Sequence, residues 1–187
     1  MRSLKPQIPP SFGNKVLRAA WTVTWFLLVR TSPTPLFGWR NMVLRLFGAE
    51  IGPGVHVYPS VRVWAPWNLV MKPGSCLGPE VDCYCVDRIV VGRDAVVSQR
   101  AFLCTASHDD RERGFGLITA PLTIGEDAWV AAEAYVGPGV ELGAGSVVGA
   151  RAVVVKDIAA GAVAVGNPAR VVAQKPGRPK IAITSAE

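Results

Sequence analysis

Branched aliphatic residues recur at every sixth position through the second half of the chain. The series reads Ile124, Val130, Val136, Leu142, Val148 and Val154. The residue directly after each aliphatic is usually Gly or Ala, and the fourth residue after it is small or short. A period of six fits neither an α-helix, which repeats about every 3.6 residues, nor a strand, which alternates every two. It predicts a parallel β-helix in which each hexapeptide supplies one short strand and one turn.

The same frame extends back to residue 51 and groups the repeats in threes. Its core positions are Ile51, Val57, Val63, Met71, Leu77, Cys83, Val91, Val97 and Leu103. Two extra residues separate Val63 from Met71, and two more separate Cys83 from Val91. An insertion after every third repeat indicates three hexapeptides per coil, which gives about five coils for the whole array. Core aliphatics should stack on those of the next coil about 4.8 Å away.

Small residues such as Ala95, Ala101 and Ser107 are expected to fit the corners of the coils. Gly after each aliphatic is expected to supply the unusual backbone angles of the turns. An all-β sandwich is the alternative fold, but its strands recur every 8–12 residues and not every six. The pattern thus favours a β-helix domain over residues 51–172, with residues 173–187 as a flexible tail.

Residues 1–50 form an N-terminal helical extension that does not follow the hexad. Asn14–Arg30 is predicted as a helix with Leu17, Trp21, Trp25 and Leu28 on one face. Ser32–Pro35 ends it, and Gly38–Phe47 is predicted as a second short helix. Two interpretations remain open. The helices cap the exposed edge of the first coil, or residues 14–30 make peripheral contact with a membrane or a lipid-linked substrate.

The hexad breaks off at His108, one of only two histidines in the chain. The next core position, 109, is Asp, and the segment Asp109–Thr123 contains charged residues that cannot be core. The frame resumes at Ile124, so a loop over 109–123 is predicted to leave the solenoid at a corner. An imidazole beside a loop on a rigid coil can act as a general base near neutral pH.

Composition narrows the possible partners and cofactors. The net charge of +6 suits an anionic partner, but no recognition-helix pattern or aromatic-interleaved basic stripe points to nucleic acid. Cys83 and Cys85 form a CxC, and the second histidine, His56, stands far from it, so no metal site is expected. A zinc enzyme of the γ-class carbonic anhydrase type would need three histidines. The apolar run Ala19–Val29 is too short to cross a bilayer, so a cytoplasmic location is expected. This location allows contact with the inner surface of the membrane.

Several motifs resemble one family over nearly the whole chain. They are TASHD, IGEDAWVAAEAYVGPGVELGAGSVVGARAVVVKD and GNPARVV, together with RVWAPWNL and VVSQRAFLCTASHD. These segments resemble the left-handed β-helix O-acetyltransferases, and especially the colanic-acid-biosynthesis type of sugar acetyltransferase. The resemblance implies a homotrimer with active sites between subunits, acetyl-CoA as donor, and direct transfer to a hydroxyl of a sugar or glycan precursor. His108 stands at the position of the family's general base.

The resemblance also assigns roles to residues around the base. Five positions match those that bind the donor: Trp129, Ala131, Gly149, Lys156 and Arg170. Among these, Trp129 would line the coenzyme channel, Ala131 and Gly149 would meet the pantetheine arm, and the two cations would face the phosphates. Asp82 and Tyr84, in VDCY, fall near the acceptor-binding positions, although relatives place Asn where this chain has Asp82. A serine or amino-sugar N-acetyltransferase and a non-catalytic β-helix scaffold remain alternative functions.

Overall fold

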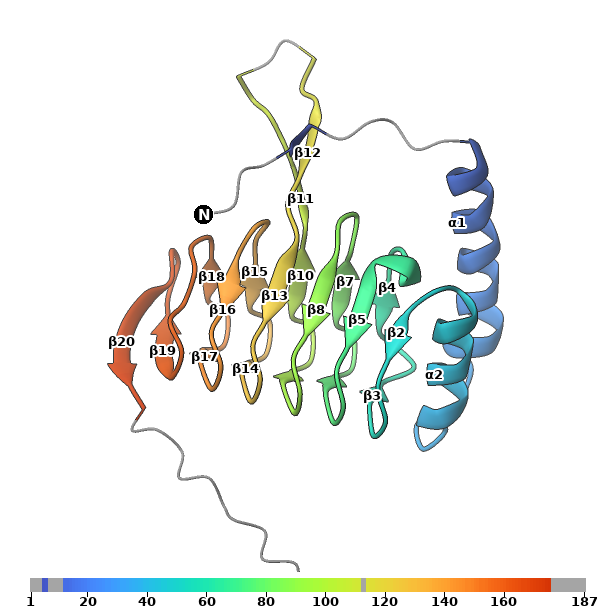
Figure 1. Ribbon diagram of the computed structural model, residues 1–187, viewed down its shortest axis with the longest axis horizontal. Coiled ribbons are helices and arrows are strands. Elements are labelled where there is room, and N and C mark those ends of the chain that lie inside the picture. The colour runs from blue at the N-terminus through green and yellow to red at the C-terminus, as the bar shows by residue number, and fades with distance from the viewer. Residues whose placement is uncertain (1–4, 7–11, 112–113, 176–187) are drawn as a thin grey trace, which may run out of the picture.

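The computed structural model describes residues 5–6, 12–111 and 114–175, and these form a left-handed parallel β-helix with two helices at its N-terminal end (Figure 1). Three sheets make three faces of the solenoid. Face 1 contains β2 (Glu50–Ile51), β5 (Leu69–Met71), β8 (Ile89–Val91), β13 (Leu122–Ile124) and β16 (Glu141–Leu142). Face 2 contains β3 (His56–Val57), β6 (Cys76–Leu77), β9 (Val96–Val97), β14 (Trp129–Val130), β17 (Val147–Val148), β19 (Ala162–Val165) and the antiparallel β20 (Arg170–Gln174). Face 3 contains β4 (Arg62–Val63), β7 (Asp82–Tyr84), β10 (Phe102–Cys104), β15 (Tyr135–Val136) and β18 (Val153–Val154).

The strand register confirms three hexapeptides per coil. Ile124 pairs with Leu142, eighteen residues further along the chain, and Val130 pairs with Val148 at the same interval. The core positions from 124 to 154 are at most 1% exposed, so each aliphatic is buried between its neighbours one turn above and below. Full burial of such a side chain contributes about 1.5–3 kcal/mol, and only stacking provides it because a single coil has no core of its own.

The glycines that follow the aliphatics have a different cause from the one predicted. Gly125 and Gly143 do not have a positive φ; that conformation falls on corner residues further along, such as Asp127 and Gly145. A Cβ at Gly125 would lie 2.6 Å from the backbone nitrogen of Ala144 in the next coil. Glycine is therefore required here by the close approach of two backbones, and the left-handed turn residue can be Asp, Glu or Arg.

All the insertions in the hexad occur at the corner between face 3 and face 1, called the insertion corner below. The first holds the 3-10 helix η2 (Pro66–Asn68), and the third holds a hairpin of β11 (Ala106–His108) and β12 (Leu117–Thr119). β1 (Lys5–Pro6) pairs with β12 and completes a small sheet outside the solenoid. The prediction that Ser107 fills a corner is wrong, because the chain has already left the coil there and the side chain of Ser107 is exposed.

The N-terminal extension contains α1 (Phe12–Thr24), the π-helical turn η1 (Trp25–Val29) and α2 (Phe37–Leu46), which confirms two helices. The predicted face is correct only in part. Trp21 and Trp25 pack on the first coil, but Leu17 and Leu28 are 42% and 44% exposed. The hydrogen bond from Arg30 N to Trp25 O spans five residues, and the wider turn places Val29 inward instead of Leu28.

Both helices cover the open end of the first coil (Figure 1). Val43 and Leu44 of α2 are buried against it, and the buried Arg40 donates from Nε to Val57 O at 2.6 Å and from Nη1 to Pro33 O at 2.7 Å. Burial lowers the pKa of Arg40. Within the residues that the structure describes, no helix has the length and apolarity needed to span a membrane. The predicted tail beyond Lys175 lies outside those residues.

Candidate functional site

His108 lies at the end of β11, on the hairpin that leaves the insertion corner (Figure 1). Its Nδ1 is 2.8 Å from the carbonyl oxygen of Phe115 across the hairpin. A carbonyl only accepts hydrogen bonds, so Nδ1 carries the proton in the neutral ring and Nε2 keeps its lone pair. The ring also stacks on Phe115, with centroids 4.5 Å apart and planes 5° apart. The arrangement holds the imidazole in the tautomer that a general base needs.

A pocket of about 360 Å³ lies between α1 and face 3 of the same chain. Its walls include Arg18 and Trp21 of α1, Arg62 and Trp64 of the first coil, and Asp82 and Tyr84 of β7. The Arg18 guanidinium carbon lies 3.7 Å from the centroid of the Trp64 ring, and the rings of Trp64 and Tyr84 are 5.0 Å apart. Aromatic faces beside hydrogen-bonding charged groups suit a polar ring such as a sugar.

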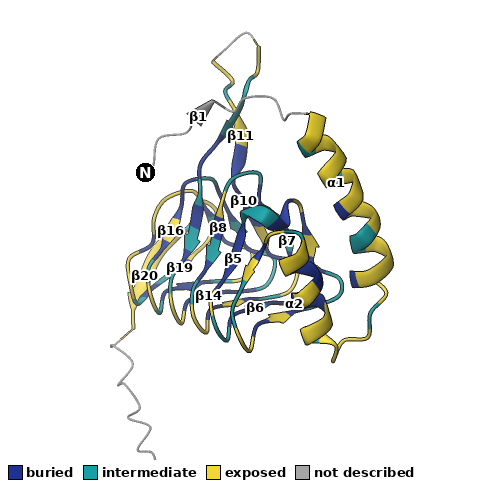
Figure 2. Cartoon of the chain, turned by 45° about the vertical axis from the view of Figure 1, so that its right-hand side comes forward, coloured by how far each residue is buried: buried dark blue, intermediate teal, exposed yellow. Residues whose placement is uncertain are grey.

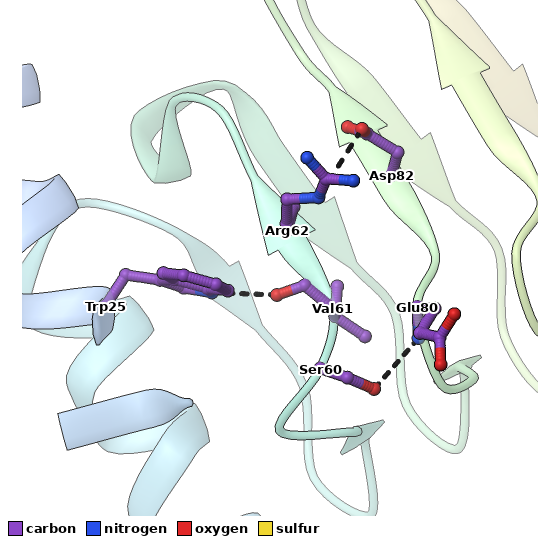
Figure 3. Close-up of polar contacts among 6 residues, drawn as sticks. All are labelled: Trp25, Ser60, Val61, Arg62, Glu80 and Asp82. Carbon is purple, nitrogen blue, oxygen red and sulfur yellow. Dashed lines mark hydrogen bonds and ion pairs between the residues drawn. The ribbon is translucent and has the colours of Figure 1, made fainter. Parts of the chain in front are cut away.

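The charged floor of the pocket comes from equivalent positions in consecutive coils (Figure 3). Arg62 and Asp82 are paired in the β4–β7 ladder, and Nε of Arg62 lies 3.8 Å from Oδ2 of Asp82. Burial raises the pKa of Asp82, and the Arg62 charge offsets part of that rise. The indole of Trp25 donates to Val61 O at 2.8 Å, which fixes the helix against this edge of the pocket. A Ser60 hydroxyl accepts from the backbone N–H of Glu80 at 2.9 Å and ties the two coils together.

The pocket wall and the root of the hairpin are directly bonded. Thr105 donates to the carbonyl of Tyr84 through both its backbone N–H, at 3.3 Å, and its hydroxyl, at 2.9 Å. Three residues after Thr105 the chain reaches His108. The sequence-predicted residues Asp82, Tyr84 and His108 therefore belong to one continuous region of a single chain, on face 3 and the insertion corner.

Most of the predicted donor-binding residues gather on face 2. Trp129 is 48% exposed on β14, and its indole donates to the hydroxyl of Ser98 at 2.9 Å. Ala131 and Gly149 follow paired strands, and thus occupy the same corner in consecutive coils. A Cβ at Gly149 would lie 2.7 Å from Val165 Cγ1, so a larger residue at 149 would require Val165 to shift. Arg170 is exposed on β20, beside the end of β19.

These residues fit a coenzyme in part. An exposed indole, a corner without bulky side chains and a cation suit a narrow pantetheine arm that leads to phosphates. The backbone N–H groups of Ala131 and Gly149, however, already donate to Val148 O and Ala164 O in the coil ladder, so contact there would be through shape and carbonyl oxygens. Lys156 is not brought to this group, because it is exposed at the insertion corner after β18.

His108, the predicted base, and the predicted donor-binding group lie on different parts of one chain. Face 2, which carries Trp129, is the one face that does not border the insertion corner, from which His108 projects. Sequence reasoning also missed Arg18, Arg62 and Trp64 as site residues. The signal for Arg62 and Trp64 was the spacing of twenty residues that places Arg62 beside Asp82 and Trp64 beside Tyr84, whereas Arg18 lies outside the repeat.

No group of three or more His, Cys, Asp or Glu side chains in the described part of the chain is arranged to hold a metal ion. His56, the other histidine, lies on β3 with its ring 4.5 Å from that of Phe37 in an edge contact. His56 thus contacts the helical cap, and β3 lies away from β11 (Figure 1).

Comparison with known proteins places this architecture in a family. Residues 121–156 match the bacterial transferase hexapeptide model, which comprises six repeats. The chain is 39% identical over 170 residues to the Escherichia coli K12 protein named as a colanic acid biosynthesis acetyltransferase, WcaF. The aligned region covers 90% of this chain and 93% of that protein. The chain therefore belongs to the hexapeptide-repeat acetyltransferases, a class of acetyl-CoA-dependent acyltransferases.

Two solved structures share the fold. A galactoside acetyltransferase in complex with coenzyme A superimposes with a TM-score of 0.81 at 22% identity, over 91% of this chain and 86% of that chain. A hexapeptide-repeat acetyltransferase of Vibrio cholerae complexed with acetyl-CoA superimposes with a TM-score of 0.79 at 21% identity, over 88% of this chain and 90% of that chain.

Proposed function

We propose that this protein transfers an acetyl group from acetyl-CoA to a hydroxyl of a sugar or glycan precursor, with His108 as general base. The observation that carries the proposal is the bond between His108 Nδ1 and the Phe115 carbonyl, which leaves Nε2 free to accept a proton. Removal of the hydroxyl proton makes the acceptor oxygen nucleophilic enough to attack an acyl carbon directly. The donor supplies an activated thioester, so no acyl-enzyme and no metal are required.

The pocket beside α1 is the acceptor site in this proposal. Trp64 and Tyr84 offer ring faces, and Asp82 and Arg62 offer an acceptor and a donor of hydrogen bonds to hydroxyls. A volume of about 360 Å³ is at the small end of ligand pockets and suits one or two sugar units. The link from Tyr84 to Thr105 keeps the bound acceptor in register with the hairpin that carries the base.

The donor site is completed by a second subunit. One chain carries the base and the acceptor pocket on one side and Trp129, Ala131, Gly149 and Arg170 on face 2. A closed homotrimer places face 2 of one subunit against the insertion corner of the next and repeats this seam three times. Lys156 at the insertion corner would then face the coenzyme from the other side of the seam.

Four free thiols fit a reducing compartment, so we place the reaction in the cytoplasm. The proposal is tested by the release of CoA thiol from acetyl-CoA in the presence of a panel of sugars, nucleotide sugars, amino sugars and serine. We expect release with sugars that lack an amine, and a fall of about two to four orders of magnitude in turnover for His108→Ala. Release only with amino sugars or serine would point to the N-acetyltransferase alternative.

A thermal-shift titration with CoA separates loss of chemistry from loss of binding. His108→Ala should keep the increase in melting temperature that CoA gives to the wild-type protein, because a ligand that binds only the folded state stabilises it. The absence of both CoA stabilisation and thiol release in the wild-type protein would leave the scaffold alternative. Undiminished turnover in His108→Ala would remove this residue from the mechanism.

A further inference from the structure

The helical cap exposes an apolar surface on its outer side. We define the cap surface as Val16, Val23, Phe26, Leu27, Met42 and Leu46 of α1, η1 and α2. Phe26 and Leu27 are 61% and 57% exposed, and Leu46 is 76% exposed. Figure 2 shows the two helices side by side at one end of the solenoid, with their outer sides in the colour of exposed residues.

The residues of the cap surface are not exposed because the helices are loosely attached to the solenoid. The indole of Trp21 donates to Val63 O at 2.7 Å, Val29 is 2% exposed, and Trp39 of α2 donates to Leu28 O at 2.9 Å. α1 and η1 are thus firmly attached to the first coil and to α2, although the pocket beside Arg18 stays open between α1 and face 3. A helix that only caps a solenoid needs one apolar side and a polar outer side, whereas a helix that is apolar all round is normally covered on every side.

The distribution of charged residues along the chain indicates which partner covers the cap surface. Residues 1–49 contain seven Lys or Arg and no Asp or Glu, whereas residues 50–187 contain thirteen Lys or Arg and fourteen Asp or Glu. Five of these seven cations lie in the cap, from Lys15 to Arg45, whereas residues 50–187 carry a net charge of −1. Arg40 is buried, but Lys15 and Arg30 are exposed near the two ends of the α1–η1 segment. Cations beside exposed Phe and Leu form the pattern of a helix that lies in the plane of an anionic membrane.

We propose that the cap surface docks on the surface of a bilayer that contains anionic lipids, with α1 and η1 lying in the interface. A second copy of this chain is a poorer occupant. Pairing of two such caps would place cations against cations with no acidic residue in either cap to neutralise them. The apolar side chains enter the boundary between headgroups and acyl chains, and the cations contact lipid phosphates. This docking is independent of acetyl transfer.

Flotation of the full chain with lipid vesicles tests the proposal. We expect binding to vesicles of phosphatidylglycerol and phosphatidylethanolamine, much weaker binding to vesicles of phosphatidylcholine alone, and release by high salt. Phe26→Ser combined with Leu27→Ser should abolish flotation, because the interface loses its two large side chains. Lys15→Glu combined with Arg30→Glu should weaken binding to the anionic vesicles by more than about tenfold.

Matched variants at other sites control for general changes in polarity and charge. Val171→Ser combined with Val172→Ser removes two residues that are 56% and 62% exposed on β20, and Lys72→Glu combined with Lys175→Glu makes the same charge change outside the cap. Both should float like wild type, and thermal melts should show that all variants fold. A wild-type protein that stays out of the anionic vesicle fraction overturns the proposal. So does a cap variant that floats normally, or one whose only effect is a smaller assembly in sedimentation velocity, which would make the cap surface a contact between copies.

Discussion

The imidazole of His108 and the phenyl ring of Phe115 are stacked 4.5 Å apart with their planes 5° from parallel. The same Phe115 supplies the carbonyl oxygen that lies 2.8 Å from His108 Nδ1. One residue therefore fixes the ring plane through its side chain and the tautomer through its backbone. The two contacts can be separated by mutation, because only the side chain changes when Phe115 is replaced.

Phe115→Ala removes the stack and keeps the carbonyl, so we expect a kcat lower by about ten- to a hundredfold with little change in the acceptor KM. Phe115 has a φ of 45°, which is unfavourable for a bulky residue. Phe115→Gly should thus lose as much activity as Phe115→Ala but melt at a higher temperature than Phe115→Ala. Steady-state kinetics and thermal melts check both points. An unchanged kcat in the two variants would mean that the ring does not position the base.

A substitution at Gly143 tests whether close approach of two backbones is the reason for the regularly spaced glycines of the coils. A Cβ at this position would lie 2.3 Å from Ala160 N, so Gly143→Ala should destabilise the protein by about 3 kcal/mol. Gly38, near the start of α2, has nothing within 4 Å of its added Cβ. Gly38→Ala should therefore stabilise the protein by about 0.5 kcal/mol through higher helix propensity. Denaturant titration measures both, and equal effects would contradict the steric explanation.

Asp82 makes a pH-dependent contribution to the stability of the folded protein. Burial raises its pKa above the ordinary value of 3.8, so the folded protein holds this proton more tightly than the unfolded chain does. The contribution of Asp82 to stability therefore falls as pH rises from below that value through the folded pKa, and it stays reduced at neutral pH. Asp82→Asn should raise the melting temperature at neutral pH, and the difference should vanish in acid.

The opposing charge provides a control for Asp82. Arg62→Met removes the group that lowers the pKa of Asp82, so the loss of stability with rising pH should be larger than in the wild-type protein. Asp82→Asn should also raise the KM for the acceptor and leave CoA stabilisation intact. A stability curve of Asp82→Asn that runs parallel to that of the wild type would show that this carboxyl does not titrate abnormally.

A subunit-mixing experiment tests the shared active site. In the proposed mechanism His108→Ala lacks the base, and Trp129→Ala combined with Arg170→Ala lacks donor contacts, so each protein alone should be nearly inactive. If each site takes its base from one subunit and its donor contacts from the next, unfolding and refolding equal amounts together should restore about a quarter of wild-type activity. Recovery that never exceeds the sum of the two separate activities would mean that each site belongs to one subunit.

The periodic part of the chain was predictable because the same packing contact repeats at a fixed interval along the sequence. Each core aliphatic from Ile124 to Val154 meets the residue eighteen positions away, so a count of six and of three is enough to place it. The face of the N-terminal helix was not predictable in the same way. Leu17 and Leu28 were as apolar as Trp21, and only a π-helical turn and the Arg18–Trp64 contact decide which residues face inward.

For the candidate site, the sequence predicted individual residues but not their arrangement in space. His108 could be found because it stands at the break of a regular pattern, but the pairing of β11 with β12 and the role of Phe115 depend on a segment without any period. The pocket was missed because its walls join α1 to residues some forty positions later, such as Arg62 and Trp64. Only the folded cap brings them together.

Among the described coils, the chain varies in length at the insertion corner. Two corners keep the hexad length in every described coil, while the third accommodates η2, a short turn or a full hairpin without any shift in the β13–β8 register. Loops of other lengths could therefore be grafted at this corner while the stacked core stays as it is. Diversifying these segments should alter the surface around the hairpin that carries His108 without loss of the solenoid.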